Sequence, residues 1–489
     1  MGGILIFSNE FWALLWAVNT ILAFYVVFHR KRSVATSWAW LIILLIFPIL
    51  GFILYGFIGR GLSQENLFAI NNQKHIGLNK VNKMIPRVPK SAGPTDTSKE
   101  AKILIDYFNF KHDSPLSKNN KISFYTDGEK KFEALFKDIE QAQETVNVEY
   151  YSFMNDDLGN KFLNLLIKKA REGVKVRLIY DPWGSPGASR TWFKPLTDLG
   201  GEVVAFITAQ NMIKKYRMNY HLHRKIVVID GRISWTGGFN VGDQYVSKSK
   251  KFGYWRDTHL RIVGSASLLL QERFVMDWNA SITDKNQTIS FNEKLFPKIE
   301  ENQLTEDDVA TQIVSDGPDT STPYLRNGMI RMMMMARKTL WIQTPYLVPD
   351  DPMIATWVIA AHSGVDVRIM IPSMPDHPFI YRATQWYANY LLHEGIKIYV
   401  YDNGFIHAKT VMVDDRFAAA GSMNQDFRSY SLNFETDAVF YDKNITRELN
   451  HIFEKDLAKC TELTLEITDN WSRYLRFKQA FSRLLSPIL

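Results

Sequence analysis

The chain has 489 residues, of which 46% are hydrophobic and 22% charged, so it is neither a disordered chain nor a collagen-like one. At ~150 residues per domain, this length predicts roughly three domains. A single cysteine, Cys460, excludes an intramolecular disulfide and a cysteine-based zinc site. The net charge of +7 favours a nucleic-acid or membrane partner.

The positive charge is concentrated near the N-terminus. Residues 1–60 carry a net charge of +3, and residues 61–100 carry another +3, which leaves +1 for the remaining chain. The excess therefore lies beside the most apolar part of the sequence. Basic residues next to a membrane segment are attracted to anionic headgroups by ~1 kcal/mol each. A solvated linker would carry the same charges, and residues 61–100 are polar and contain proline and glycine, as linkers do.

Two uncharged apolar runs predict a transmembrane hairpin within residues 1–60. Residues 11–28 form a run of 18 residues, and residues 38–59 form a run of 22. At 1.5 Å per residue the second run would be about 33 Å long, enough for a hydrocarbon core of ~30 Å. The alternatives are a cleaved signal peptide and a buried core helix. Cleavage is disfavoured because no Lys or Arg precedes residue 30 and a second apolar run follows. Basic residues on both sides of the hairpin nearly cancel, so its orientation stays open.

The rest of the chain repeats one α/β pattern. In the first half, helical patterns alternate with the strand patterns 146–153 and 173–181, and in the second half with 340–350 and 364–372. A polar segment, 281–310, separates the predicted domains 101–280 and 311–489. The pattern recurs after 184 residues, too long for a solenoid repeat. It fits a duplicated α/β domain built on mixed sheets.

The strongest signal is a motif that occurs once in each half. A histidine and a lysine two residues apart are followed by an aspartate after four residues. After six more comes a glycine pair, or Gly-Ser, and then an asparagine. The first copy is His223, Lys225, Asp230, Gly237, Gly238 and Asn240, and the second is His407, Lys409, Asp414, Gly421, Ser422 and Asn424.

The spacing has a chemical meaning. Residues i and i+2 of a strand face the same side, so each histidine and lysine can enter one cleft together. Two such edges face to face would supply two imidazoles, two ammonium groups and two amides around one anion. That set suits a phosphodiester, in which one histidine attacks phosphorus and the other protonates the leaving alkoxide. We expect Asp230 and Asp414 to fix the turns that follow the strands.

Other residues leave alternatives open. His221 and His223 could form a metal pair, but no acidic residue accompanies them locally and nearby lysines would repel a cation, so no metal is expected. Glu149 and Gln343 follow equivalent strands and could contact hydroxyls of a substrate or only support the sheet edge. The methionine run 332–335 could be core or a lipid-facing patch.

The two motifs resemble the paired HKD signatures of the phospholipase D superfamily. The hairpin, the run PILGFILYGFIGR and the order of the elements resemble more narrowly the bacterial cardiolipin synthases with two membrane spans, over nearly the whole chain. The resemblance implies duplicated phospholipase D-like α/β domains with pseudo-twofold symmetry after an N-terminal transmembrane helical hairpin. It also implies one active site at the interface, a multi-pass protein of the bacterial plasma membrane, and no cofactor.

The resemblance further implies residue roles. His223 would be the nucleophile and His407 the general acid, although the spacing itself leaves open which histidine attacks. An acidic residue downstream of each motif would orient a histidine, and Asp257 and Glu435 fit this role by their order along the repeat. Their spacing is unequal, because Asp257 follows Asn240 by 17 residues and Glu435 follows Asn424 by 11. Ser422 stands where the first copy has Gly238, as a hydroxyl donor or as a space filler. The residues expected to hold the phosphate are Lys225, Lys409, Asn240 and Asn424.

The implied reaction converts two phosphatidylglycerols into cardiolipin and glycerol through a phosphatidyl-histidine. A membrane-bound phospholipase D or another phosphatidyltransferase would use the same residues, because acceptor choice depends on water exclusion and pocket shape. A nuclease of the superfamily is disfavoured by the near-neutral charge after residue 100. Two complete motifs disfavour a non-enzymatic scaffold. The expected partners are phosphatidylglycerol, cardiolipin and an anionic membrane, without nucleic acid, and the oligomeric state stays open.

Overall fold

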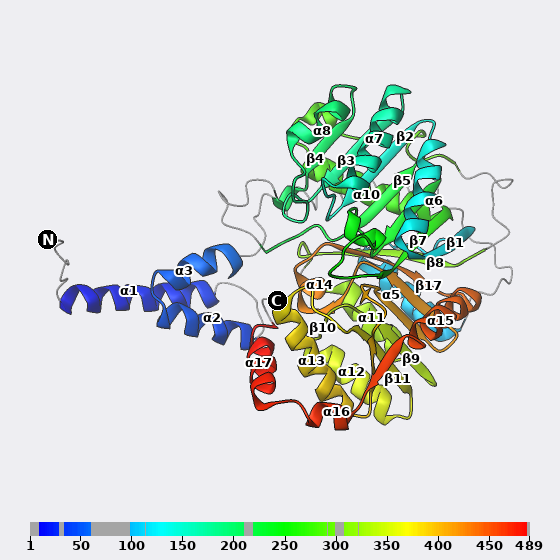
Figure 1. Ribbon diagram of the computed structural model, residues 1–489. Coiled ribbons are helices and arrows are strands. Elements are labelled where there is room, and N and C mark those ends of the chain that lie inside the picture. Colours follow the sequence, from blue (N-terminus) through cyan, green and yellow to red (C-terminus); the bar gives the residue numbers. More distant parts are fainter. Residues whose placement is uncertain are drawn as a thin grey trace.

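Three apolar helices precede two α/β lobes in the computed structural model of the chain (Figure 1). The first lobe comprises residues 114–298, and the second comprises residues 308–486 together with helix α5 (Lys99–His112). The structure describes residues 9–28, 34–59, 98–112, 114–209, 219–290, 292–298, 308–320 and 322–486. Residues 60–97, which include most of the predicted linker 61–100, lie outside this part.

The N-terminal helices differ from the predicted hairpin in one respect. Helix α1 (Asn9–Phe28) is long and apolar enough to cross a membrane, and it is the one such helix in the described residues. The predicted continuous helix over residues 38–59 is wrong, because α2 (Val34–Ile46) ends before Pro48. Proline lacks the backbone donor that a helix interior needs, and Ile49 follows with a φ of 73°. The chain resumes as α3 (Leu50–Leu54) and the π-helical turn η1 (Tyr55–Gly59).

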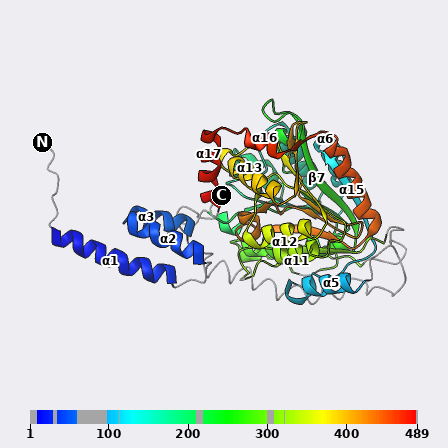
Figure 2. The same ribbon diagram turned by 90° about the horizontal axis from the view of Figure 1, so that it is seen from below.

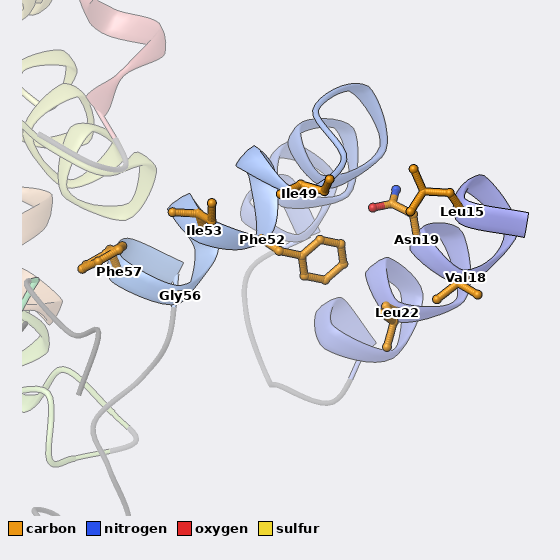
Figure 3. Close-up of a pocket in the computed structure, with 9 residues that line it drawn as sticks. All are labelled: Leu15, Val18, Asn19, Leu22, Ile49, Phe52, Ile53, Gly56 and Phe57. Carbon is orange, nitrogen blue, oxygen red and sulfur yellow. The ribbon is translucent and has the colours of Figure 1, made fainter. Parts of the chain in front are cut away.

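These helices pack on one another and expose an apolar outer surface. The buried Asn19 side chain donates a hydrogen bond to the Leu44 carbonyl at 3.0 Å, joining α1 to α2 as polar groups do between membrane helices. Ile21 is 69% exposed and Phe28 is 74% exposed. An almost wholly apolar groove lies between α1 and the segment α3–η1, lined by Leu15, Val18, Asn19, Leu22, Ile49, Phe52, Ile53, Gly56 and Phe57 (Figure 3).

A mixed sheet with strand order β1-β7-β6-β5-β2-β3-β4 forms the first lobe. Its strands are β1 (Asn120–Asp127), β2 (Thr145–Tyr150), β3 (Lys175–Tyr180), β4 (Glu202–Ala205), β5 (Lys225–Ile229), β6 (Ile233–Gly237) and β7 (Trp255–Gly264). Its helices are α6 (Gly128–Glu140), α7 (Asp157–Arg171), α8 (Arg190–Thr197) and α10 (Ala266–Ser281), with short turns η2 (Ile207–Ala209), η3 (Asp243–Val246) and η4 (Lys285–Gln287).

The second lobe repeats this plan with strand order β18-β12-β11-β9-β14-β15-β17-β8. These strands are β8 (Thr311–Asp316), β9 (Thr339–Gln343), β11 (Asp366–Pro372), β12 (Lys397–Tyr401), β14 (Thr410–Val413), β15 (Phe417–Gly421), β17 (Glu435–Phe440) and β18 (Cys460–Leu463). The other helices are α11 (Tyr324–Met333), α12 (Asp351–His362), α13 (Pro378–His393), α14 (Phe427–Ser431), α15 (Lys443–Leu457), α16 (Leu465–Asp469) and α17 (Arg473–Leu484). A small sheet pairs β10 (Leu347–Val348) with β16 (Gln425–Asp426).

The two lobes share one interface and part of one core. Strand β13 (Phe405–Ile406) leaves the second lobe and pairs with β7 of the first. Phe206 and Phe124 of the first lobe pack on Phe434 and Phe440 of the second, with ring centroids 5.0 and 6.0 Å apart. The predicted duplicated α/β fold is therefore confirmed, and the motif strands β5 and β14 begin where the lobes meet.

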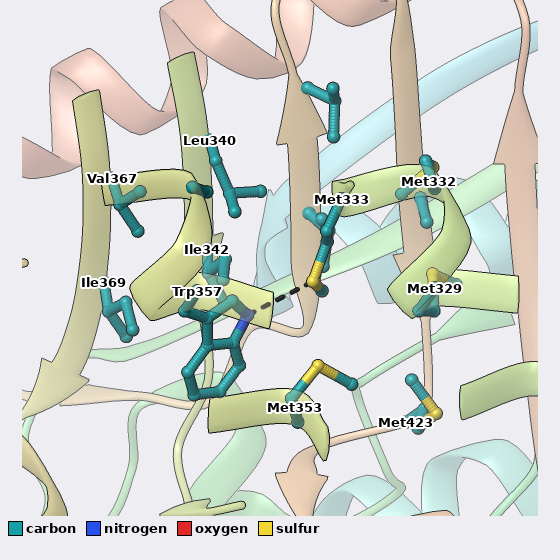
Figure 4. Packing of buried hydrophobic residues seen from close by; sticks show 14 of the residues in the cluster. Met329, Met332, Met333, Leu340, Ile342, Met353, Trp357, Val367, Ile369 and Met423 are labelled. Atoms are coloured by element: carbon teal, nitrogen blue, oxygen red, sulfur yellow. Dashed lines mark hydrogen bonds between the residues drawn. The ribbon is translucent and has the colours of Figure 1, made fainter. Parts of the chain in front are cut away.

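Most of the methionine run 332–335 lies in the core of the second lobe. Met332, Met333 and Met335 are buried, whereas Met334 is 56% exposed. Trp357 of α12 donates its indole N–H to the Met333 sulfur at 3.2 Å (Figure 4). The run therefore packs in the hydrophobic core beneath α11 and does not form a lipid-facing patch.

Candidate active site

The motif aspartates lie at the far ends of their strands from the histidines. Asp230 has a φ of 52°, and its carboxylate accepts backbone N–H bonds from residues 143–145 at 2.8 Å each. Asp414 has the same φ and accepts from Lys338 and Thr339 at 2.8 and 3.0 Å. Both carboxylates tie a turn to the start of a neighbouring strand, so their role is structural.

Each motif histidine contacts a carboxylate from the other lobe. His223 Nδ1 lies 2.9 Å from Glu435 Oε2, and His407 Nδ1 lies 2.6 Å from Asp257 Oδ2. The backbone repeats the exchange, because His223 N–H donates to the Phe434 carbonyl at 2.9 Å and His407 N–H donates to the Arg256 carbonyl at 2.7 Å. The interface therefore brings the two motifs into one site.

Strand register explains why Asp257 and Glu435 are equivalent despite their unequal spacing. Gly237 pairs with His259, and Gly421 pairs with Asp437, so the two acids stand two residues before equivalent positions. The extra residues in the first lobe form the loop that contains η3. Insertion into a loop changes the sequence spacing and leaves the strand positions unchanged.

The two lysines lie beside their histidines in buried positions. Lys225 Nζ donates to the His223 carbonyl at 2.5 Å. Lys409 Nζ lies 3.1 Å from His407 Nε2 and also donates to the His407 carbonyl. Burial is the main cause that lowers the pKa of Lys225 to about 7 and that of Lys409 to about 8.

Burial and the lysines also set the charge of the imidazoles. Burial, reinforced by Lys225 and Lys409, holds the pKa of His223 well below its usual range. Burial and then Lys409 lower the pKa of His407 to about 4, against the opposing effect of Asp257. Without a bound anion both imidazoles are neutral near pH 7, so His223 has a free lone pair when its Nδ1–H donates to Glu435.

The residues after the glycines complete the site in different ways. Ser422 Oγ donates to Glu435 Oε2 at 2.6 Å, so this hydroxyl holds the carboxylate that contacts His223. At the matching position a Cβ on Gly238 would lie 1.9 Å from Asp257 Oδ1, so only glycine fits there. Asn240 Oδ1 accepts from the Ser152 N–H at 3.2 Å, and Asn424 is buried.

A small pocket opens onto this site, with a volume of ≈ 140 Å³. His221 lies at its wall, where Nδ1 is 3.3 Å from Asp181 Oδ2 and the ring stacks near Trp183. Among the described residues, no group of three His, Cys, Asp or Glu side chains is placed to hold a metal ion. The lining residues are Tyr151, His221, His223, Tyr346, Val348, His377, Ile380, Asn424, Asp426, Arg428 and Asn433.

Two buried arginines behind the site were not predicted. Arg224 donates from Nε to the Glu435 carbonyl at 3.2 Å and pairs with Asp277 at 2.7 Å. Arg256 crosses the interface to Asp456 at 2.6 Å and donates to the Asp257 carbonyl. Each arginine thus holds the backbone of a residue that contacts a histidine. Position is the sequence signal that could have identified them, because Arg224 directly follows His223 and Arg256 directly precedes Asp257.

Glu149 and Gln343 belong to this supporting layer. Gln343 Nε2 donates to Asp456 Oδ2 at 2.9 Å, which completes the Arg256 ion pair. Glu149 is fully buried, and burial, then the charge of Asp277, raises its pKa well above the usual range. The contact of Gln343 and the complete burial of Glu149 favour the sheet-supporting alternative over contact with glycerol.

Two duplicated sheets that face each other with paired His, Lys and Asn residues define the phospholipase D class of proteins. The fold of phosphatidylserine synthase from Haemophilus influenzae Rd KW20 agrees, with a TM-score of 0.57 and 15% identity over 75% of this chain and 95% of that one. A family model described as "Cardiolipin synthase, PLD-like domain" matches residues 135–265 and 329–457. Another, described as "Phospholipase_D-nuclease N-terminal", matches residues 17–60.

Curated relatives match almost from end to end. Cardiolipin synthase from Listeria welshimeri is 43% identical over 476 residues, which are 96% of this chain and 97% of the relative. Cardiolipin synthase from Staphylococcus aureus Mu50 is 41% identical over 475 residues, which are 96% of this chain and 95% of the relative. The chain therefore belongs to the cardiolipin synthase family of phospholipase D-like proteins.

Proposed function

We propose that the protein is a cardiolipin synthase that transfers a phosphatidyl group from one phosphatidylglycerol to another and releases glycerol. The observation that carries this proposal is the meeting of two buried His-Lys pairs across the lobe interface. Each histidine is held by a carboxylate of the opposite lobe. The identity of 41–43% to cardiolipin synthases over nearly the full length supports the choice of substrate.

In the first step, His223 attacks the phosphodiester of the donor lipid. Its Nδ1–H donates to Glu435, which leaves the Nε2 lone pair free to form the N–P bond. The P–O bond to the headgroup glycerol breaks, and His407 gives its proton to the departing alkoxide. Glu435 stabilises the positive charge that develops on the His223 imidazole.

In the second step, a hydroxyl of another phosphatidylglycerol takes the place of the released glycerol. Neutral His407 accepts the hydroxyl proton while the oxygen forms a bond to phosphorus. The N–P bond breaks, and His223 recovers its lone pair. The two steps are the reverse of each other in form, so the overall transfer is reversible.

The low pKa values of the site residues suit an anionic substrate. A phosphodiester placed between the lysines adds a negative charge, which favours the charged forms of Lys225, Lys409 and His407. Substrate binding therefore raises these pKa values, and His407 takes up from the solvent the proton that it later gives to the leaving alkoxide. The ammonium groups then stabilise the phosphoryl oxygens in the transition state.

The pocket is large enough for a lipid headgroup but not for a whole lipid. A volume of ≈ 140 Å³ accepts a headgroup and leaves two acyl chains outside. Two lipid headgroups bound in so small a pocket exclude water from it, which favours a lipid hydroxyl as acceptor. A phospholipase D would use the same residues with water as the acceptor.

We further propose that the protein is a multi-pass protein of the bacterial plasma membrane. Helix α1 crosses the bilayer, and residues 34–59 return through it as a broken helix. The exposed apolar side chains of these helices and the Asn19–Leu44 bond support this arrangement. Cysteine labelling at residues 9, 34 and 164 tests it, because two crossings place residue 9 and the lobes on one side of the bilayer and residue 34 on the other.

The test of activity is a product assay with the purified full chain in phosphatidylglycerol vesicles, with a chelator present. Equal amounts of cardiolipin and glycerol are expected. Phosphatidic acid as the main product would make the protein a hydrolase, and no product would contradict the proposal. His362→Ala, on the exposed side of α12, is the control for histidine variants.

The roles of the histidines need a donor with an activated leaving group. His223→Ala is expected to abolish both turnover and the covalent intermediate. His407→Ala is expected to abolish turnover of phosphatidylglycerol but to form the intermediate from the activated donor, which needs no acid. The opposite pattern would reverse the assigned roles.

A further inference from the structure

The last helix, α17, presents its large apolar side chains to the outside. Tyr474, Phe477, Phe481 and Leu484 are 68%, 67%, 49% and 75% exposed. Their spacing of three, four and three residues places them in one stripe along the helix. We call these four residues the outer stripe. Surface helices of water-soluble proteins turn such a stripe inward, so α17 has the reverse orientation.

The inward face of α17 is already docked on the protein. Gln479 and Ser482 are buried, and the Arg483 guanidinium lies 4.0 Å from the centre of the Trp386 ring on α13. The Tyr387 hydroxyl of α13 donates to Ser486 Oγ at 3.4 Å. Because its polar face is fixed to α13, the helix cannot rotate to bury the outer stripe without losing these contacts.

The charges of α17 indicate what the outer stripe meets. The helix carries four basic residues and no acidic one, namely Arg473, Arg476, Lys478 and Arg483. At 100° per residue, Arg473 and Lys478 fall on opposite flanks of the stripe. Cations flanking an apolar stripe match anionic headgroups above acyl chains. A second copy of the chain would bring like charges together, which is unfavourable.

The position of α17 connects it with both the membrane helices and the pocket. In both views α17 lies on the side of the lobes that faces α1–α3 (Figures 1 and 2). Helix α13, on which it packs, starts at the pocket, where His377 and Ile380 form part of the wall. Phe379 stands between them and is 53% exposed. A surface that meets α17 and Phe379 therefore borders the pocket opening.

We propose that α17 is an interfacial helix that lies on an anionic phospholipid bilayer, with the outer stripe at the acyl boundary and the flanking cations at the headgroups. It forms a second membrane contact, separate from α1–α3, that holds the pocket opening at the lipid surface. This inference rests on the exposure, charge and packing of α17 and does not depend on the reaction catalysed.

Fluorescence quenching by brominated lipid tests this contact. Cys460 is the single cysteine of the chain, so the Cys460→Ser background accepts one introduced cysteine. An environment-sensitive dye is attached to Phe477→Cys or Leu484→Cys in the full chain, reconstituted in phosphatidylglycerol vesicles at about one chain per vesicle. Asn164→Cys, exposed on α7 of the first lobe, is the matched control. Brominated phosphatidylglycerol is expected to quench both α17 positions at least threefold more than the control.

A charge variant separates headgroup attraction from apolar insertion. Arg473→Gln and Lys478→Gln together are expected to reduce the quenching at Leu484→Cys in phosphatidylglycerol vesicles, with little change in phosphatidylcholine vesicles. Equal quenching at residues 164 and 484 would overturn the proposal. Quenching that appears only at high protein density, together with cross-linking between α17 helices, would also overturn it and assign the face to a second copy.

Discussion

Glu435→Gln tests how much of the reaction depends on the charge beside His223. The substitution keeps the size of the side chain and one carbonyl oxygen but removes the negative charge. In the structure this carboxylate accepts from Ser422 Oγ at 2.6 Å and lies 2.9 Å from His223 Nδ1. Attack on phosphorus makes the imidazole positive, so the lost charge matters most in the transition state and the intermediate.

The expected magnitude follows from the strength of hydrogen bonds to charged groups. Such bonds contribute about 1.5–3 kcal/mol. At 1.36 kcal/mol per factor of ten, this loss lowers the rate of intermediate formation by roughly 10- to 150-fold. Burial raises the pKa of Glu435 to about 7, so its ionised fraction grows between pH 6 and pH 8. The ratio of wild-type to variant rate should therefore increase across this range.

The assay is single-turnover labelling of the reconstituted protein with labelled phosphatidylglycerol at pH 6 and pH 8. The Glu435 charge also raises the pKa of Lys225 and of Lys409, so both lysines lose their protons at lower pH in the variant, which increases the ratio further toward pH 8. Glu454→Gln, exposed on α15, is the control. A Glu435→Gln rate within about threefold of wild type at both pH values, or a ratio that does not change with pH, would refute the reasoning.

Three further results are expected. Gly238→Ser should lower kcat by roughly 100-fold, because its Cβ would displace the Asp257 carboxylate 1.9 Å away. Ser422→Gly should lower kcat only about tenfold, and equal decreases in kcat for the two variants would contradict this reasoning. Arg256→Met should lower the free energy of unfolding by about 3–5 kcal/mol, since it leaves the buried Asp456 carboxylate without a cation and with Gln343 alone as a donor. Adding Asp456→Leu should restore most of this free energy, as measured by urea unfolding of the full chain in detergent. Finally, kcat/KM for phosphatidylglycerol should fall as pH rises above about 7–8, where Lys225 and Lys409 lose their protons, and a flat profile to pH 9.5 would count against their role.

The duplicated fold could be predicted from the sequence, because the second half repeats the strand order and the motif spacing of the first. The equivalence of Asp257 and Glu435 followed from their order along the repeat, and strand register places both at matching positions. The motif alone left open which carboxylate contacts which histidine. That exchange arises from the packing of whole lobes, and no local pattern encodes it.

Other features depend on contacts between distant residues. Arg224 and Arg256 look like ordinary strand residues until the opposite lobe supplies a carbonyl or a carboxylate. Ser422 has a clear role only when Glu435 lies beside it. The break at Pro48 does not follow from the length and apolarity of the run, but the proline within it is a direct sequence signal for such a break.

The exchange of carboxylates makes the two lobes depend on each other. A lone lobe holds an imidazole without its carboxylate, so neither lobe by itself contains a complete half-site. The two half-sites are also unequal, because Gly238 lies beside Asp257 whereas Ser422 lies beside Glu435. Any movement that separates the lobes therefore takes both half-sites apart at once.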